Sequence, residues 1–218
     1  MKIQFLGHAS FLITTDAGTR IVTDPFDPAA YVGRLSYRAF DEPADVVTQS
    51  HEHGDHSGTS TVKGCPVIIK GAGKFKANEV EFLGVETYHD CSRGAERGRN
   101  TVFVMAVDGM RVAHFGDLGH VLTADQAAEI GAVDIALIPV GGYYTIDAAK
   151  AWEVAGQVSA QIVIPMHFAN EKCLFPIAGV DEFTAGKPRV TREGVTTLEI
   201  RAEDIPAEMT IVVLEPTL

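Results

Sequence analysis

Short hydrophobic runs alternate along the chain with turns rich in glycine, proline and aspartate. Near the N-terminus this pattern predicts strands over residues 2–6, 10–15 and 20–23, because turn residues separate runs of β-branched and aromatic side chains. Pro25 and Pro28 end the third strand, since proline cannot continue a strand ladder. Further strands are predicted over residues 46–48, 67–69, 82–87, 101–107, 111–115, 134–140 and 161–166.

Two helices are predicted in the second half of the chain. The first covers residues 123–130 and begins with Thr123 and Gln126 at the spacing of a capping box. The second covers residues 147–154. Residues 29–43 show little periodicity and are predicted to form a loop or an irregular helix. Since strands and helices alternate, we expect strands that are covered by helices.

The composition is that of a globular domain. The chain has 218 residues, of which 46% are hydrophobic and 22% are charged, and we expect a single domain over residues 1–218. Proline and glycine interrupt the longest apolar stretch, so we expect no membrane-spanning helix. The N-terminus has no long apolar segment of a secretory signal, and three cysteines cannot all pair with one another. Together these features predict a cytoplasmic location.

The balance of acidic and basic residues indicates which class of molecule the protein binds. With 18 basic and 29 acidic residues, the formal net charge is −11, which repels phosphate backbones. The sequence therefore disfavours nucleic acid as a partner and favours a small-molecule substrate. It leaves open whether the chain forms a homo-oligomer.

The strongest chemical signal is the run HEHGDH at residues 51–56, directly after a predicted strand. It holds three imidazoles and a carboxylate, the groups that zinc-type ions prefer as ligands. Within a loop, His51 and His53 can point to one side while Asp55 and His56 point to another. One loop could therefore serve two neighbouring metal ions, whereas the alternative is a polar surface turn.

This run, with its pattern HxHxDH, resembles the first metal motif of the metallo-β-lactamase-fold hydrolases. The segments GHAS at 7–10 and IVTDP at 21–25 look like the opening of the branch that includes L-ascorbate-6-phosphate lactonase-like proteins. Farther along, GD at 116–117 and IPMH at 164–167 resemble later ligand motifs. The resemblance spans nearly the whole chain. It implies an α+β fold, a four-layer αββα sandwich of two mixed sheets flanked by helices.

The resemblance requires one more histidine between the first motif and Asp117, and the chain offers His89 and His114. His89 follows a predicted strand and precedes a polar loop, from which a ligand can reach a site. His114 lies within an apolar strand and, by strand alternation, faces away from Asp117. We therefore expect His89 to be the ligand and His114 to be a packed histidine.

The implied ligands form two sets of three joined by one bridging carboxylate: His51, His53 and His89 on the first ion, Asp55, His56 and His167 on the second, and Asp117 between them. Asp55 and His167 are also predicted to be catalytic. We expect two divalent ions, zinc first and manganese or iron as alternatives, because histidine–carboxylate sites accept all three. Such ions lower the pKa of bound water from about 15.7 to near 7, which supplies a hydroxide nucleophile.

Several residues around this set are candidates for supporting it or for contacting substrate. Asp24 resembles the family's aspartate that orients a ligand histidine, although it could also be a simple strand-terminating residue. His8 is placed either to face the pocket or to lie on the surface. The remaining candidates follow predicted strands: His120, Tyr143, Tyr144 and Thr145.

The resemblance implies a metal-dependent hydrolase that cleaves an ester, lactone or phosphoester bond of a small metabolite. Two other functions compete with this prediction. One is a nuclease or phosphodiesterase of the same fold that acts on nucleic acid, which the net charge disfavours. The other is a metal-binding protein without catalytic turnover.

Overall fold

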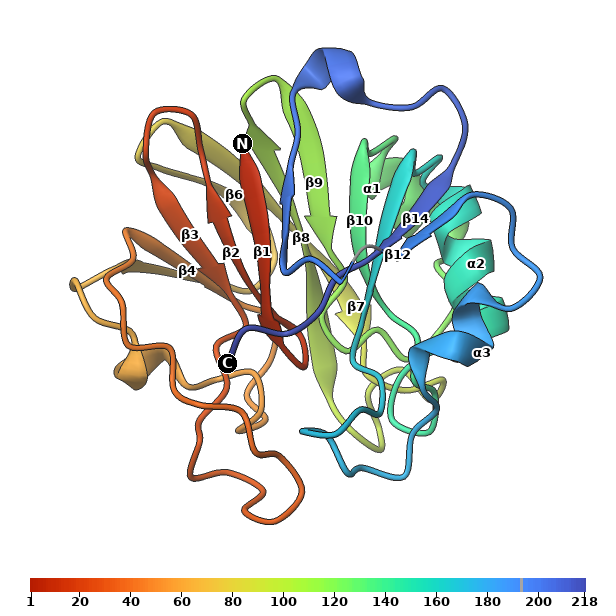
Figure 1. The fold of residues 1–218 in the computed structure, drawn as a ribbon, viewed down its shortest axis with the longest axis horizontal. Coiled ribbons are helices and arrows are strands. Elements are labelled where there is room, and N and C mark those ends of the chain that lie inside the picture. Colours follow the sequence, from red (N-terminus) through yellow and green to blue (C-terminus); the bar gives the residue numbers. More distant parts are fainter. Residues whose placement is uncertain (193) are drawn as a thin grey trace.

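The structure is a computed structural model that describes residues 1–192 and 194–218. Two mixed β-sheets face one another, and the helices lie on the outer side of the larger sheet (Figure 1). The predicted α+β class, with two mixed sheets and flanking helices, is confirmed.

The smaller sheet has its strands in the order β13-β1-β2-β3-β4-β5. Its members are β1 (Lys2–Gly7), β2 (Ser10–Thr14), β3 (Arg20–Thr23), β4 (Val46–Gln49), β5 (Val67–Lys70) and β13 (Thr197–Glu199). The strands from β13 to β3 pair antiparallel, whereas β4 pairs parallel with both β3 and β5. Because β3 and β4 are parallel, their carboxyl ends lie side by side.

The larger sheet has the order β12-β14-β11-β10-β9-β8-β7-β6. Its members are β6 (Gly73–Ala77), β7 (Val80–Tyr88), β8 (Arg99–Val107), β9 (Met110–His114), β10 (Ile135–Pro139), β11 (Ile162–Met166), β12 (Val190–Arg192) and β14 (Thr210–Val213). The strands from β6 to β9 pair antiparallel, and those from β9 to β12 pair parallel. The predicted strands over residues 101–107 and 111–115 correspond to β8 and β9, which pair antiparallel as a hairpin.

Three helices cover the larger sheet: α1 (Ala124–Ile130), α2 (Ala148–Gln157) and α3 (Val180–Thr184) (Figure 1). The predicted capping box is present at α1, where Thr123 accepts from the backbone N–H of Gln126 and the Gln126 side chain accepts in return. Asp147 caps α2 by accepting from the backbone N–H of Lys150. None of the described helices is long and apolar enough to cross a membrane.

The outer face of the smaller sheet is covered differently. Loop segments and a one-turn 3-10 helix (Thr59–Thr61) lie over it instead of a long helix within the described residues. Phe40, Ala44 and Val62 from these segments pack on Leu12 and Val47 of the sheet. This covering explains why residues 29–43, predicted as a loop or irregular helix, carry buried aromatic side chains.

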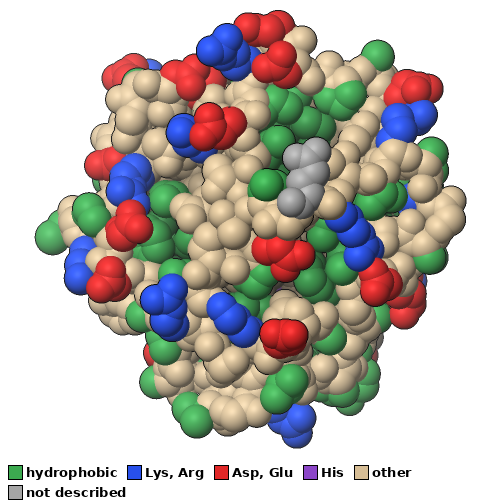
Figure 2. Space-filling model, in the orientation of Figure 1, with side chains coloured by type: hydrophobic (Ala, Val, Ile, Leu, Met, Phe, Trp, Pro, Cys, Tyr) green, Lys and Arg blue, Asp and Glu red, His purple; other side chains and the backbone are tan. Residues whose placement is uncertain are grey.

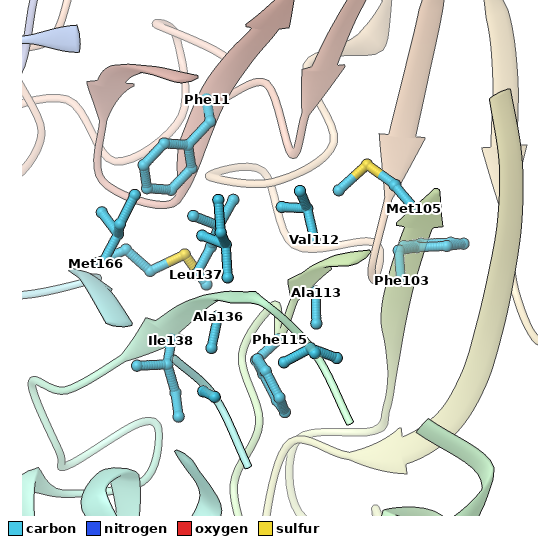
Figure 3. Close-up of a cluster of buried hydrophobic side chains, with 14 of the residues drawn as sticks. Phe11, Phe103, Met105, Val112, Ala113, Phe115, Ala136, Leu137, Ile138 and Met166 are labelled. Atoms are coloured by element: carbon cyan, nitrogen blue, oxygen red, sulfur yellow. The ribbon is translucent and has the colours of Figure 1, made fainter. Parts of the chain in front are cut away.

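The main core fills the space between the two sheets (Figure 3). Phe11 of β2 points across this space toward Leu137 and Met166 of the larger sheet. Its ring centroid lies 4.9 Å from that of Phe5 and 6.2 Å from that of His114, and all of these side chains are buried. The core therefore fixes the distance between the sheets, and with it the relative position of the strand ends.

Several elements were not predicted from the pattern of the chain. They are β6, β12, β13, β14 and α3. Apart from β6, these elements lie in the last forty or so residues, where strands are short and half-exposed and give a weak alternation. β6 is an edge strand that presents Lys74 and Lys76 to solvent, so its sequence lacks the hydrophobic run that marks a buried strand.

Replacing Phe11 with alanine tests the role of this inter-sheet core. Phe11→Ala leaves a cavity among fully buried neighbours, so we expect a loss of about 3–5 kcal/mol in the free energy of unfolding. Val32→Ala, at a side chain that is 80% exposed, serves as control and should change stability by about 0.5 kcal/mol or less. Urea unfolding measures both variants, and equal midpoints for Phe11→Ala and the parent would contradict the assignment.

Candidate metal centre

The polar residues singled out in the sequence lie where strands end, at one edge of the paired sheets. Asp24 follows β3, His51 follows β4 after one residue, and His89 follows β7 directly. Asp117 lies three residues beyond β9, and His167 follows β11 directly. Since the two sheets pack face to face, strand ends from both sheets converge on one point.

The first predicted ligand set is brought together. His51, His53 and His89 each offer one nitrogen such that these atoms lie within 4.8 Å of one another. His51 Nε2 and His53 Nδ1 lie 3.1 Å apart. Imidazoles that share a point in this way are typical of a zinc-type site.

The second predicted set is also brought together, and a fourth residue joins it. Ligand atoms of Asp55, His56 and His167 lie within 4.8 Å of one another and of a nitrogen of His8. His8 Nε2 lies 3.0 Å from Asp55 Oδ2, within hydrogen-bond distance. His8 is therefore buried beside the cluster and is not a surface histidine.

Asp117 lies between the two sets, with its carboxylate facing four imidazoles. Its closest contacts are His56 Nε2 to Oδ1 at 3.1 Å, and His89, His167 and His51 Nε2 to Oδ2 at 3.1, 3.4 and 3.9 Å. Two ligands bound tetrahedrally at about 2.0–2.1 Å from one zinc ion lie roughly 3.3–3.4 Å apart. The spacing around Asp117 matches that separation.

Unsatisfied buried atoms give an independent test of whether metal ions fit here. His56 Nε2 and Asp117 Oδ1 are buried and have no hydrogen-bond partner among the described residues, although they lie 3.1 Å apart. A buried polar atom without a partner is costly and rare in folded proteins. An ion bound by both atoms would satisfy them, so the donor set fits divalent metal ions.

The charge state of the cluster suits cation binding. Burial opposes ionisation of Asp117, but His167, His56 and His89 outweigh it and hold the pKa of Asp117 well below its ordinary value. Burial likewise opposes ionisation of Asp55, and His56 and His8 lower its pKa nonetheless. Both carboxylates are therefore anionic at neutral pH, as metal ligands must be.

Asp24 and Ser50 contact the Nδ1 atoms of His56 and His51, so the Nε2 atoms of these histidines are left to face the cluster. Asp24 Oδ2 accepts a hydrogen bond from His56 Nδ1 at 2.8 Å, which leaves Nε2 to face the cluster. Asp24 also accepts from the backbone N–H and from the hydroxyl of Ser50. Ser50 Oγ in turn lies 3.0 Å from His51 Nδ1. This is the arrangement in which a carboxylate fixes the orientation of a ligand imidazole.

His8 positions the second set through both its ring and its backbone. Burial raises the pKa of Cys173 to about 11, so its thiol is protonated and faces His8 Nδ1 at 3.8 Å. The other nitrogen, Nε2, is then the one that donates to Asp55. The carbonyl of His8 accepts from the backbone N–H of His167 at 2.8 Å.

Asn100 holds Asp117 in position through hydrogen bonds to the backbone around it, and this residue was not identified from the sequence. Its Oδ1 accepts from the backbone N–H of Asp117 at 2.9 Å, and its Nδ2 donates to the carbonyl of Phe115. Gly116, between these two, has φ +54°, and a Cβ there would lie 2.3 Å from Asn100 Oδ1 and 2.5 Å from Ser50 Cβ. Only glycine fits this close approach.

A cavity of about 190 Å³ opens above the cluster. Its floor is formed by His53, Asp55, His89, Asp117 and His167. Its walls are Tyr31, Arg97, Tyr144 and Phe175, of which the sequence analysis identified Tyr144 alone. The other three come from loops whose side chains follow no regular period, so no sequence pattern marks them.

The remaining candidates lie outside this cavity. His120 was a candidate for contacting substrate, but its Nε2 accepts from the backbone N–H of Tyr88 and its Nδ1 faces the carbonyl of Val121, so backbone groups occupy both ring nitrogens. Tyr143 is 68% exposed and Thr145 is buried, and both line a neighbouring cavity of about 250 Å³.

The loop after His89 is held by one carboxylate, that of Asp90. Asp90 accepts from the backbone N–H groups of Ser92, Gly94, Glu96 and Arg97 at 2.8–3.0 Å. Burial raises the pKa of this carboxyl, but the four donors outweigh burial and lower the pKa to about 2. The loop that bears Arg97 is therefore firmly ordered beside a candidate ligand.

Comparison with known proteins identifies the class. Residues 2–167 match the model of the β-lactamase superfamily domain. Curated relatives named "UPF0173 metal-dependent hydrolase" include one from Carboxydothermus hydrogenoformans, 31% identical over 77% of this chain and 84% of the relative. Another, from Nitratidesulfovibrio vulgaris, is 29% identical over 81% of this chain and 82% of the relative.

A solved structure is also similar. It is a Thermotoga maritima protein assigned to the Zn-dependent hydrolases of the metallo-β-lactamase superfamily, with 40% identity, a TM-score of 0.82 and 99% of each chain covered. The present chain therefore belongs to the β-lactamase superfamily and is a metal-dependent hydrolase within it.

The role of Asp24 can be tested through metal affinity. Asp24→Asn keeps the shape and tolerates the observed φ of 40°, but its amide can present an N–H where His56 needs an acceptor. We expect metal affinity to fall roughly 10- to 100-fold. Competition with a chromogenic chelator measures it, and Asp41→Asn on the surface is the control. Unchanged affinity in Asp24→Asn would refute the assigned role.

The buried histidines predict how the metal-free protein responds to pH. Burial, reinforced by neighbouring imidazoles, lowers the pKa of His8 to about 4 and of His51 to about 3. In the unfolded chain both titrate near the ordinary value of about 6.5, so between pH 6.5 and 4 the unfolded state binds more protons. The pKa of His56 is raised, because Asp117 and Asp55 outweigh its burial, so its protonation favours the folded state and offsets part of this effect as the pH falls through 6.5.

We therefore expect the chelator-treated protein to lose stability as pH falls from 7 to 5, by an amount on the order of 2 kcal/mol for each of these two histidines. Urea unfolding at the two pH values measures this change. Relief of the net charge of −11 alone would instead raise stability on acidification. A midpoint that rises at pH 5 would contradict the account.

Proposed function

We propose that this hydrolase holds two divalent metal ions and cleaves an ester, lactone or phosphoester bond of a small metabolite. The observation that carries the proposal is the single carboxylate of Asp117, which faces imidazoles from both ligand sets at 3.1–3.9 Å. Zinc is the first choice of metal, and manganese or iron would suit the same donors.

The residues of the chain have distinct parts in this chemistry. Bound ions would supply Lewis acidity and bring the pKa of a water molecule near 7. Asp55 and His167 line the cavity floor, where the reacting bond must lie, and we assign them the catalytic contacts. Because Asp55 is ionised, it can accept a proton or orient a water molecule but cannot act as an acid at neutral pH.

The cavity favours a small substrate over a polymer. At about 190 Å³ it is below the usual size range of pockets for drug-sized ligands, about 300–1,000 Å³. Acidic and basic side chains are interspersed over the face in Figure 2, and this face shows no continuous basic surface of the kind that binds a phosphate backbone.

A hydrolysis panel with metal titration tests the proposal. The purified protein is stripped with chelator, reloaded with zinc, manganese or iron, and assayed on lactones, carboxylic esters, phosphodiesters, thioesters and single-stranded RNA. We expect activity on a small substrate that requires metal. Asp117→Asn should lower kcat by at least roughly 100-fold, because it disrupts the shared ligand. Asp125→Asn, an exposed residue at the start of α1, is the matched control.

Three outcomes would contradict the proposal. Activity that survives complete metal removal would exclude the metal centre as its source. Stoichiometric metal without turnover on any panel member would favour a metal-binding protein. Cleavage of RNA alone would favour the nuclease alternative.

A further inference from the structure

The cavity walls combine one cation with an aromatic surface, and the metal centre itself uses neither. Tyr31, Phe175 and Tyr144 form the aromatic surface, with ring centroids 5.4 Å apart for Tyr31 and Phe175 and 5.7 Å for Phe175 and Tyr144. Among the described residues that line this cavity, Arg97 is the one lysine or arginine, and it faces the same space as the carboxylates of Asp55 and Asp117.

Arg97 is held in place at three points. Its backbone N–H donates to Asp90 at 2.8 Å, and the loop is closed by a hydrogen bond from the His89 N–H to the carbonyl of Gly98. Its guanidinium lies 5.8 Å from the ring centroid of Tyr144, within the range of a cation–π contact. The side chain is one-third exposed, so it borders both the cavity and solvent.

The positive charge of the Arg97 guanidinium is only weakly compensated by acidic side chains of the protein. Its nearest acidic partner is Glu96, at 3.9 Å and 60% exposed, and such an exposed pair contributes little. One oxygen of Glu96 already accepts from Ser92 Oγ at 2.6 Å. Within the described residues the guanidinium makes no hydrogen bond, so its planar donors are available to a ligand.

We propose that Arg97 binds an anionic group of the substrate, a carboxylate or a phosphate that is not the bond being cleaved, while the body of the substrate packs on Tyr31, Phe175 and Tyr144. This inference rests on the proposed function and narrows it to small anionic esters, lactones or phosphoesters with a planar or apolar portion. Arg97 anchors the charge at the cavity wall, and the scissile bond then lies over Asp55 and His167.

Calorimetric titration of the zinc-loaded protein with three matched probes tests this binding mode. The probes are 3-phenylpropionate, 2-phenylethylphosphonate and the neutral 3-phenylpropanamide. We expect one of the anionic probes to bind at least roughly 10-fold more tightly than the amide, since a charge-assisted bidentate contact has about this effect. The tighter anion distinguishes a carboxylate substrate from a phosphate substrate.

Variants separate Arg97 from the metal ions as the source of the preference. Arg97→Met should weaken the preferred anion about 10- to 100-fold and leave the amide unchanged, and Arg97→Lys should fall between. Arg93→Met removes an exposed charge from the same loop and should bind all three probes as the parent does. Asp90→Asn should weaken the anion selectively, because it frees the backbone of Arg97.

Two results would overturn the inference. One is an anion preference that persists in Arg97→Met, which would place the anion on the metal ions. The other is failure of all three probes to bind. If either result is obtained with a protein that hydrolyses a panel substrate, the inference fails while the proposed function stands. Arg97-dependent binding without hydrolysis of any panel substrate would do the reverse.

Discussion

A buried carboxylate enclosed by imidazoles is the constraint on which the rest of this structure depends. Asp117 is 2% exposed and faces His51, His56, His89 and His167. An isolated charge at such depth is strongly disfavoured unless it is paired or bound to metal. The strands must therefore end at positions that bring those imidazoles to it, and the core between the sheets keeps the ends in register.

Buried side chains around Asp117 hold this carboxylate and the neighbouring ligands in position. Asn100 holds the backbone of Asp117, Asp24 orients His56, and His8 holds Asp55. Each of these side chains is buried and hydrogen-bonded to a residue from another segment of the chain. Small errors in sheet packing would misplace several ligands at once, which is why the contact between Phe11 of the smaller sheet and His114 of the larger sheet matters to the site.

The sequence revealed the parts of the site that are local. Residues 51–56 carry their chemistry within one loop, and the spacing of Thr123 and Gln126 marks the start of α1 directly. Contacts made between distant segments were harder to see. Asn100 looks like an ordinary strand residue, and the wall residues Tyr31 and Phe175 meet only because two irregular loops fold over the strand ends.

His120 shows that closeness to a ligand in the sequence does not ensure a place in the site. Its position just after Asp117 suggested a place at the pocket rim, but the chain turns away there and both ring nitrogens face backbone atoms. The short strands β12 to β14 were missed for a related reason. Strands that are half-exposed and three or four residues long leave too little alternation to distinguish them from loops.

We propose that this chain holds two metal ions that share Asp117. X-ray absorption spectroscopy of the purified protein, combined with elemental analysis, would count these ions and measure their ligand distances. We expect two ions per chain, a shell of nitrogen and oxygen ligands at about 2.0–2.2 Å, and a metal–metal distance of roughly 3.5–4 Å. A single ion per chain without a metal neighbour, or a sulfur ligand at about 2.3 Å, would contradict it.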